Sequence, residues 1–199
     1  KYLGRGSYGT VDAVTRTFAI GEHRYARKTF IFPRKPKQRE LNRILQEIEI
    51  ARNLQHIHIV RLVETYQAEH TYAMIMQPVA DGNLESYLSD LDDDDEHMDN
   101  GRRAHVSQWF GCLINALAFL HARRIVHGDI KPQNILTVQG NILLTDFGLS
   151  REFQEQTISE TTEKRGTPRY RSSEEEDGRR AGRRSDVFSL GAVFLEMLT

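Results

Sequence analysis

Three separated groups of residues in this sequence have the types and spacing that chemistry on a phosphate needs. Residues 4–11 carry glycines at positions 4, 6 and 9, which let backbone N–H groups approach phosphate oxygens without a Cβ in the way. Residues 127–134 contain Asp129 and Asn134, and Asp146 follows them. In this order the groups could cover a phosphate, orient an attacking hydroxyl and supply two oxygen ligands to Mg²⁺. The chemistry they indicate is phosphoryl transfer from ATP.

The elements that must position the first group are strands around one helix. Mixed apolar and polar alternation predicts strands at 11–14, 24–28, 59–63 and 72–76. Apolar residues recur at helical spacing from 38 to 54, and the Pro- and Lys-rich segment 33–37 before them cannot continue a strand. The first third of the chain therefore predicts a small sheet with one amphipathic helix.

Helical patterning dominates after a short connector at 77–80. Residues 103–124 and 184–199 predict two helices, and strands at 135–137 and 142–144 flank a Gly-Asn turn as a small hairpin. The expected plan is a sheet-rich small lobe, a hinge and a helical large lobe.

Composition limits the class of protein. The 199 residues carry a formal net charge of −1, so there is no general attraction to nucleic acid or to an anionic membrane. The longest apolar stretch, at 113–120, is interrupted by Asn115 and is too short to cross a bilayer. An acidic run at 91–99 and a basic run at 179–184 are expected to be solvated loops. The single cysteine, Cys112, excludes an internal disulfide and fits a reducing compartment, so we expect a cytoplasmic location, with the nucleus as the alternative.

The glycine-rich segment on its own fits two other structures. A dinucleotide-binding domain uses the same glycine spacing, but a helix must follow it. Here residues 11–17 continue as a strand, so residues 4–11 are expected to form a β-hairpin that covers a phosphate. An ordinary Gly-rich turn stays open as long as this segment is considered alone.

Taken together, the motifs resemble those of the eukaryotic protein kinase family. They are the glycine loop, His-Gly-Asp-Ile-Lys-Pro-Gln-Asn at 127–134, Asp-Phe-Gly at 146–148, Gly-Thr-Pro-Arg-Tyr-Arg-Ser-Ser-Glu at 166–174, and residues 185–191, which resemble the start of helix F. The resemblance implies an α+β bilobal fold, with an antiparallel β-sheet N-lobe and helix C at 1–76, a hinge at 77–80 and a mainly helical C-lobe at 81–199. It implies that the catalytic domain is incomplete and ends at about helix F.

The resemblance also implies ATP and Mg²⁺ as cofactors and gives roles to four residues. Asp129 would orient the substrate hydroxyl, and Lys131 would offset charge on the transferring phosphoryl group. Asn134 and Asp146 would ligate Mg²⁺, which favours hard oxygen ligands.

Lys28 lies in a segment that resembles the family's Val-Ala-Ile-Lys strand, and it would contact the α- and β-phosphates. A lysine that points into a cleft needs a carboxylate to hold it. Glu47 on the following helix is the expected partner, because Glu49 would lie roughly 200° away around the helix axis.

The implied nucleotide site extends beyond the lysine. The N–H of Val79 would donate to adenine, the carbonyl of Gln77 would accept from it, and Met76 would be the gatekeeper. The residues expected to contact the nucleotide are Gly4, Gly6, Gly9, Val11, Ala26, Lys28, Met76, Gln77, Val79 and Leu136.

Gly128 departs from the commonest form of the family, which has an arginine there that pairs with a phosphorylated residue. Glu163 stands three residues before Gly166, where many relatives carry the phosphorylated threonine. We expect from both features that loop phosphorylation is not the main switch. A solvated Glu163, or phosphorylation of Thr161 or Thr162 recognised by another basic residue, stays open.

Three functions stay open. The segment 131–133 resembles the loop of Ser/Thr protein kinases, whose partners are ATP and a protein substrate. His-Gly-Asp is common in small-molecule kinases of the aminoglycoside or choline type, although the glycine loop and segment 166–170 argue against that class. The third possible function is that of a pseudokinase or nucleotide-binding scaffold, because a domain with an incomplete lower lobe could bind ATP and transfer its phosphate poorly. We expect phosphorylation of Ser and Thr hydroxyls on proteins, no nucleic-acid or membrane partner, and an oligomeric state that the sequence does not predict.

Overall fold

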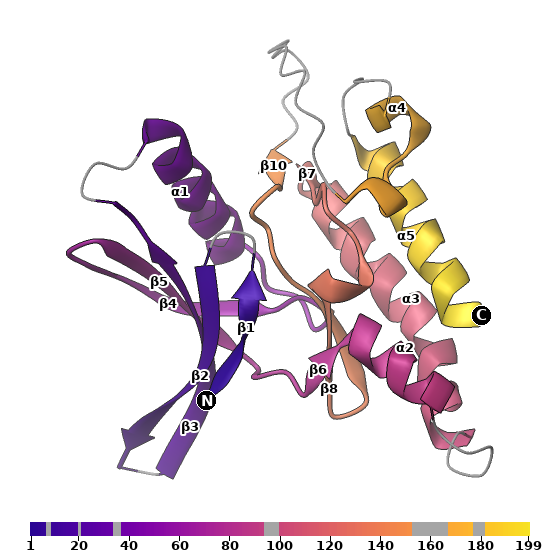
Figure 1. The fold of residues 1–199 in the computed structure, drawn as a ribbon, viewed down its shortest axis with the longest axis horizontal. Coiled ribbons are helices and arrows are strands. Elements are labelled where there is room, and N and C mark those ends of the chain that lie inside the picture. Colours follow the sequence, from indigo (N-terminus) through magenta and orange to yellow (C-terminus); the bar gives the residue numbers. More distant parts are fainter. Residues whose placement is uncertain (7–8, 20, 34–36, 94–99, 153–166, 177–181) are drawn as a thin grey trace.

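A sheet-rich part and a helical part lie side by side in the molecule (Figure 1). The computed structural model describes residues 1–6, 9–19, 21–33, 37–93, 100–152, 167–176 and 182–199. The N-terminal third of the chain forms the first part, and the residues after the connector at 77–80 form the second. This is the bilobal α+β plan that the sequence predicts.

The first part is a five-stranded antiparallel sheet in the order β1-β2-β3-β5-β4. Its strands are β1 (Tyr2–Gly6), β2 (Gly9–Phe18), β3 (Gly21–Ile31), β4 (Arg61–Ala68) and β5 (Thr71–Gln77). Helix α1 (Gln38–Arg52) packs on this sheet, because Ile44, Ile48 and Ala51 recur on one helical face. Phe30 and Met74 of the sheet complete this small core.

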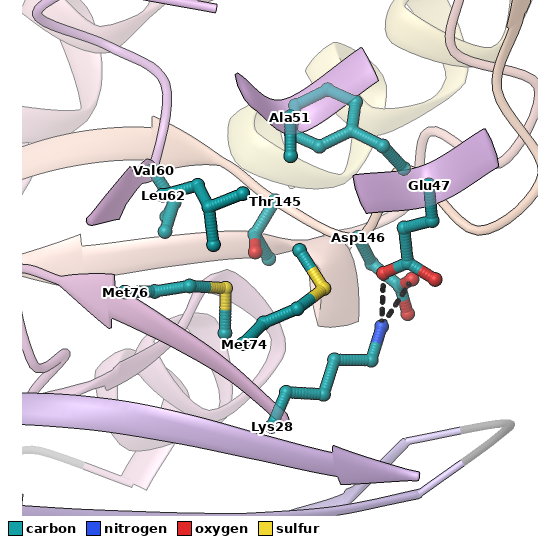
Figure 2. A pocket seen from close by; sticks show the side chains of 10 residues that line it. Lys28, Glu47, Ala51, Val60, Leu62, Met74, Met76, Thr145 and Asp146 are labelled. Atoms are coloured by element: carbon teal, nitrogen blue, oxygen red, sulfur yellow. Dashed lines mark hydrogen bonds and ion pairs between the residues drawn. The ribbon is translucent and has the colours of Figure 1, made fainter. Parts of the chain in front are cut away.

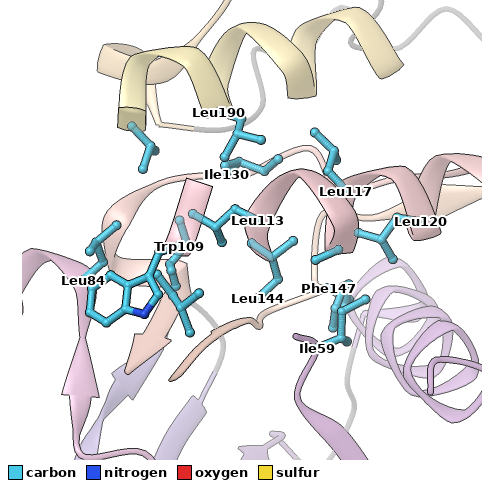
Figure 3. Packing of buried hydrophobic residues seen from close by; sticks show 14 of the residues in the cluster. Ile59, Leu84, Trp109, Leu113, Leu117, Leu120, Ile130, Leu144, Phe147 and Leu190 are labelled. Carbon is cyan, nitrogen blue, oxygen red and sulfur yellow. The ribbon is translucent and has the colours of Figure 1, made fainter. Parts of the chain in front are cut away.

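The second part is built around α3 (Asn100–Ala122) and α5 (Arg183–Leu198), with α2 (Leu84–Asp93) beside them (Figure 1). Leu113 and Leu117 of α3 and Leu190 of α5 belong to one buried cluster between these helices (Figure 3). The shorter elements are β6 (Gly82–Asn83), β7 (Ile125–Val126), η1 (Pro132–Asn134), β8 (Ile135–Val138), β9 (Asn141–Leu144), β10 (Arg151–Glu152), η2 (Pro168–Tyr170) and α4 (Ser173–Glu176).

The predicted strands and helices are confirmed in type, and their ends differ by a few residues. Strand β4 begins at Arg61 rather than at 59, because Ile59 leaves the sheet and forms a parallel bridge with Leu144 of β9. Helix α3 begins at Asn100, three positions before the predicted start. Cys112 packs partly buried against the core of the second part.

The prediction that both charge runs are loops is wrong for the described residues. Leu84, Leu88 and Leu91 follow one another at helical spacing, so α2 continues through the start of the acidic run to Asp93. The end of the basic run lies in the first turn of α5, since arginine is a good helix former. The rest of each run lies outside the described residues. No helix in the described parts of the chain combines the length and the apolar character that a membrane span requires.

Candidate active site

Lys28 is held between two carboxylates in the interior of the molecule. Alternate residues of β3 are buried, which turns the Lys28 side chain toward α1. Its Nζ lies 2.6 Å from Oε1 of Glu47 on α1 and 2.9 Å from Oδ1 of Asp146 (Figure 2). The predicted Lys28–Glu47 ion pair is therefore present, whereas Glu49 is exposed to solvent.

Burial and charge act in opposite directions on this cluster. Burial favours the neutral amine form of Lys28. The charges of Glu47 and Asp146 outweigh this effect of burial and raise the pKa of Lys28. Burial raises the pKa of Glu47. At Asp146 the effect of burial is outweighed by the Lys28 charge, which lowers the pKa of that carboxyl. Lys28 is therefore a fixed cation at neutral pH, held by Glu47 and Asp146.

The glycine segment forms the turn region between β1 and β2, where Gly6 pairs with Gly9. A strand follows it, as the phosphate-cover interpretation requires, and not the helix of a dinucleotide-binding domain. A Cβ at Gly9 would collide with the carbonyl of Thr29 on β3, so this close approach of two strands needs glycine. Gly4 has open space around it, and Tyr8 lies outside the described residues.

Strand register brings four of the expected nucleotide contacts next to one another, in two pairs. Val11 pairs with Lys28 across β2 and β3, and Ala26 pairs with Met76 across β3 and β5. Met76 and Lys28 also line one small cavity behind the lysine, together with Asp146 (Figure 2). These positions, from β2, β3 and β5, therefore lie next to one another in the sheet.

The other expected nucleotide contacts lie on the connector and on the hairpin that follows it. Gln77 is the last residue of β5, and Val79 comes two positions later, before β6. Leu136 of β8 pairs with Asn83 of β6. A strand pair therefore ties the end of the connector to the hairpin that carries Leu136.

Asp129 is at the centre of a hydrogen-bond network on residues 127–134, the catalytic loop. Its Oδ2 lies 2.8 Å from Nζ of Lys131 and accepts from Nδ2 of Asn134 at 3.0 Å. Its Oδ1 accepts from Oγ1 of Thr167 at 3.1 Å. Lys131 Nζ also donates to Thr167 Oγ1 at 2.8 Å. Donors on both oxygens fix the orientation of the Asp129 carboxylate.

Asp186 in the first turn of α5 holds the backbone of the catalytic loop. Its Oδ2 accepts from the N–H of His127 at 2.9 Å, and its Oδ1 accepts from the N–H of Gly128 at 2.9 Å. The Nε2 of His121 lies 2.8 Å from the same Oδ2. His127 is fully buried, with its Nε2 3.0 Å from the carbonyl oxygen of Thr145, which fits a packing role and not a reactive one. Helix α5 and the end of α3 therefore position the loop.

Asn134 and Asp146 lie on adjacent segments, because the N–H of Thr145 donates to the carbonyl of Asn134 at 3.0 Å. Nδ2 of Asn134 donates to two oxygens of Asp129, and Oδ1 of Asp146 accepts from Lys28. Within the described part of the chain, no hydrogen bond uses Oδ1 of Asn134 or Oδ2 of Asp146. One amide oxygen and one carboxylate oxygen suit Mg²⁺, which keeps several waters and substrate phosphates as its other ligands.

Two carboxylates, Glu175 on α4 and Glu196 on α5, were not predicted from the sequence. Glu175 is buried, and its Oε2 accepts from the N–H of Ser172 at 3.2 Å. The spacing Ser-x-x-Glu at the start of α4 is a capping box, a local pattern that could have identified it. Glu196 of α5 accepts a hydrogen bond from Tyr170, a contact between distant positions that no local pattern reveals.

The loop positions tied to phosphorylation, Thr161, Thr162 and Glu163, lie outside the described residues. Gly128 is described, and its φ of +78° is in the left-handed region. The structure therefore describes the residues proposed for nucleotide and substrate chemistry, whereas the expectation about loop phosphorylation stays a prediction.

Comparison with known proteins gives one family. The model of the protein kinase domain matches residues 1–199. Serine/threonine-protein kinase 36 from Pongo abelii is 32% identical over 98% of this chain, and the match covers 14% of that protein. The cAMP-dependent protein kinase catalytic subunit PRKX from Homo sapiens is 30% identical over 99% of this chain, with 52% of that protein covered. Serine/threonine-protein kinase TIO from Arabidopsis thaliana is 30% identical over 98% of this chain, with 14% covered. The chain thus spans only a small part of the length of the first of these relatives.

Proposed function

The chain belongs to the protein kinase family, and on this premise we propose that it transfers the γ-phosphoryl group of ATP to serine and threonine hydroxyls of protein substrates. The observation that carries the proposal is the Lys28–Glu47 pair in contact with Asp146, next to a catalytic loop whose Asp129 is fixed by donors on both oxygens. Lys28 contributes a fixed cation for phosphate, and Asp129 contributes a base for the attacking hydroxyl.

In the proposed reaction, Asp129 accepts a hydrogen bond from the substrate hydroxyl and aims its oxygen at the γ-phosphorus. Lys131, 2.8 Å from Asp129, offsets charge that develops on the phosphoryl group. Lys28 holds the α- and β-phosphates, and Glu47 keeps its ammonium in place. Asn134 and Asp146 would hold Mg²⁺, which would neutralise phosphate charge when bound.

The proposed nucleotide site lies between a lobe formed by 1–76 and a lobe formed by 81–199, with 77–80 as the hinge. Gly4, Gly6 and Gly9 cover the phosphates. Val11, Ala26 and Leu136 form the apolar slot for adenine, with Met76 at its inner end. The N–H of Val79 and the carbonyl of Gln77 make the two hydrogen bonds to the adenine ring.

A protein substrate is favoured over a small molecule by one contact. Thr167 bonds both Asp129 and Lys131, so the segment that begins at Thr167 packs directly on the catalytic loop. In protein kinases this segment is the platform for a peptide. Small-molecule kinases of the aminoglycoside or choline type lack a corresponding segment.

Transfer of radiolabelled phosphate from Mg²⁺-ATP to a generic basic protein tests the proposal. We expect incorporation into phosphoserine and phosphothreonine, and its loss in Asp129→Asn. Asp90→Asn, which changes an exposed carboxylate on α2, is the matched control and should behave as wild type. Mainly phosphotyrosine, or transfer to an aminoglycoside or choline with none to protein, would contradict the proposal. ATP binding without transfer, in this chain and in a longer form of the protein, would favour the scaffold function.

A further inference from the structure

The loop at 53–60, which follows α1, is fastened to β9 in the other part of the molecule. The N–H of Val60 donates to the carbonyl of Leu144 at 3.0 Å, and the N–H of Leu144 donates to the carbonyl of His58 at 2.9 Å. Nδ1 of His58 lies 3.1 Å from the carbonyl oxygen of Ile142. Backbone and side-chain contacts of the loop therefore hold the end of α1 against β9.

The two elements that this loop connects carry the two anions around Lys28. Glu47 lies on α1, and Asp146 comes two positions after the end of β9. Both carboxylates bond to Nζ of Lys28. Val60 of the loop lines the small cavity beside these three residues (Figure 2). The position of the loop on β9 therefore affects how α1 presents Glu47 to Lys28 and Asp146.

His56 holds the turn of this loop as a neutral ring. The backbone N–H of His58 donates to Nδ1 of His56 at 3.1 Å. A backbone N–H can only donate, so Nδ1 of His56 must carry a lone pair and the ring proton is on Nε2. A proton on Nδ1 would turn this acceptor into a second donor and remove the hydrogen bond. Nδ1 of His58 faces a carbonyl and donates in either charge state, so protonation breaks only the contact of His56.

The surroundings of His56 also oppose a positive charge on its ring. The ring centroid lies 4.8 Å from that of Phe119 on α3, and the guanidinium carbon of Arg123, just after α3, lies 3.6 Å from the same Phe119 centroid. Among the described residues, the charges that act on His56 are those of His58 on its own loop and of Arg123. Burial and, after it, these two groups lower the pKa of His56. A protonated His56 therefore loses an acceptor role and gains no anion in exchange.

We propose that His56 is a positioning residue for Lys28 and its two carboxylates, and that protonation of its ring at acidic pH switches the protein to a less active form. In the neutral form, Nδ1 of His56 keeps the loop at 53–60 in the shape that fits β9. Protonation releases the N–H of His58, the loop shifts on β9, and α1 no longer holds Glu47 in its place beside Lys28. The inference rests on the proposed protein kinase function and adds a form of regulation to it.

The direction of the pH effect follows from the lowered pKa. As the pH falls below 6.5, the ordinary value for histidine, the unfolded chain takes up the proton before the folded protein does. The contribution of His56 to stability is therefore complete above pH 6.5 and is lost as the pH falls from there through the folded pKa. His56→Asn removes the titration and keeps the contact, because the amide oxygen of asparagine can take the place of Nδ1. His70→Asn, at an exposed histidine between β4 and β5, is the matched control.

Steady-state kinetics across the acidic range tests the switch, with kcat and the KM for ATP measured on one serine-containing peptide substrate. At about pH 7.5 wild type, His56→Asn and His70→Asn should have similar kcat/KM. Between about pH 7.5 and about pH 5.5, wild type and His70→Asn should lose about threefold or more activity relative to His56→Asn. A ratio of wild type to His56→Asn that stays constant over this range would overturn the inference.

Nuclear magnetic resonance gives a readout that needs no phosphoryl transfer. In wild type, the backbone amide resonance of His58 should shift with the same midpoint as the His56 ring, below pH 6.5, and amide exchange in the last turn of α1 should become faster with it. If the protein phosphorylates no peptide, the proposed function fails, and this titration still tests the coupling between ring and loop. A His58 amide that does not respond to the titration of the His56 ring, or a response that persists in His56→Asn, would overturn the inference.

Discussion

Thr167 Oγ1 lies 3.1 Å from Oδ1 of Asp129, although the two residues are 38 positions apart in the chain. The same hydroxyl accepts from Lys131, so one threonine joins the proposed base to the proposed charge-offsetting lysine. Most of the contacts of Asp129 come from its own loop. Thr167 is the contact that makes the orientation of Asp129 depend on a separate segment.

The first prediction concerns this contact. Thr167→Ala should lower kcat about tenfold or more with a smaller change in KM for ATP, because the Asp129 carboxylate loses a donor and turns away from the hydroxyl. Thr167→Ser keeps the hydroxyl and should recover most of the rate. Steady-state kinetics on the peptide substrate measures both. Equal loss in the alanine and serine variants would mean that the threonine methyl group, and not its hydroxyl, matters.

The second prediction concerns removal of the Lys28 cation, which lies between Glu47 and Asp146. Lys28→Met should abolish transfer and weaken ATP binding, and it leaves two neighbouring carboxylates without their shared cation. The free energy of unfolding should fall by about 3 kcal/mol while the fold is kept, since a buried charge loses its partner. Lys37→Met, at an exposed position before α1, is the matched control. Calorimetric titration with ATP and urea unfolding measure the two effects, and unchanged ATP affinity in Lys28→Met would contradict the assigned role.

The third prediction separates binding from transfer. Asp146→Asn should remove Mg²⁺-dependent ATP binding, because its carboxylate is a proposed ligand of the cation. Asp129→Asn should keep ATP binding and lower turnover by about a hundredfold or more, because it orients the hydroxyl and not the nucleotide. Measurement of the ATP dissociation constant and of kcat for both variants checks these two expectations. The mechanism is wrong if Asp129→Asn turns over like wild type.

The sequence predicted the parts of the site that local patterns determine. Helical spacing distinguished Glu47 from Glu49, and the strand after the glycines distinguished a phosphate cover from a dinucleotide site. Contacts between distant positions could not be predicted this way. His121 reaches Asp186 across 65 positions and Tyr170 reaches Glu196 across 26, because packing of whole helices brings them together. No periodicity in a short window encodes the relative position of two helices.

The fourth prediction is a dependence of stability on alkaline pH. The pKa of Tyr170 is raised from 10.0 to about 12, so between these values the folded protein keeps a proton that the unfolded chain has lost. The contribution of the Tyr170 hydroxyl to stability is therefore constant below pH 10 and decreases above it. Urea unfolding should show that the advantage of wild type over Tyr170→Phe shrinks by roughly 1 kcal/mol at pH 11. Tyr2→Phe, at an exposed tyrosine, is the control, and an advantage of wild type over Tyr170→Phe that stays constant to pH 11 would mean that burial and Glu196 do not raise the pKa of this phenol.

The last prediction concerns Gly128, where the family's commonest form has arginine. Its φ is +78°, and an added Cβ would lie 3.1 Å from the carbonyl oxygen of Leu149. Any side chain there must adopt left-handed backbone geometry against a fixed carbonyl, so Gly128→Ala and Gly128→Arg should both lower the free energy of unfolding by about 1–2 kcal/mol. A gain from pairing an introduced arginine with an exposed acid is at most about 1 kcal/mol and would not offset the strain.

Gly111 provides the matched comparison for Gly128. It lies inside α3 with open space where a Cβ would be, so Gly111→Ala should raise the free energy of unfolding by about 0.5–1 kcal/mol. Urea titrations of the three variants give the comparison directly. If Gly128→Ala were as stabilising as Gly111→Ala, the left-handed geometry would impose no strain, and steric cost could not explain why this chain has glycine next to its proposed base.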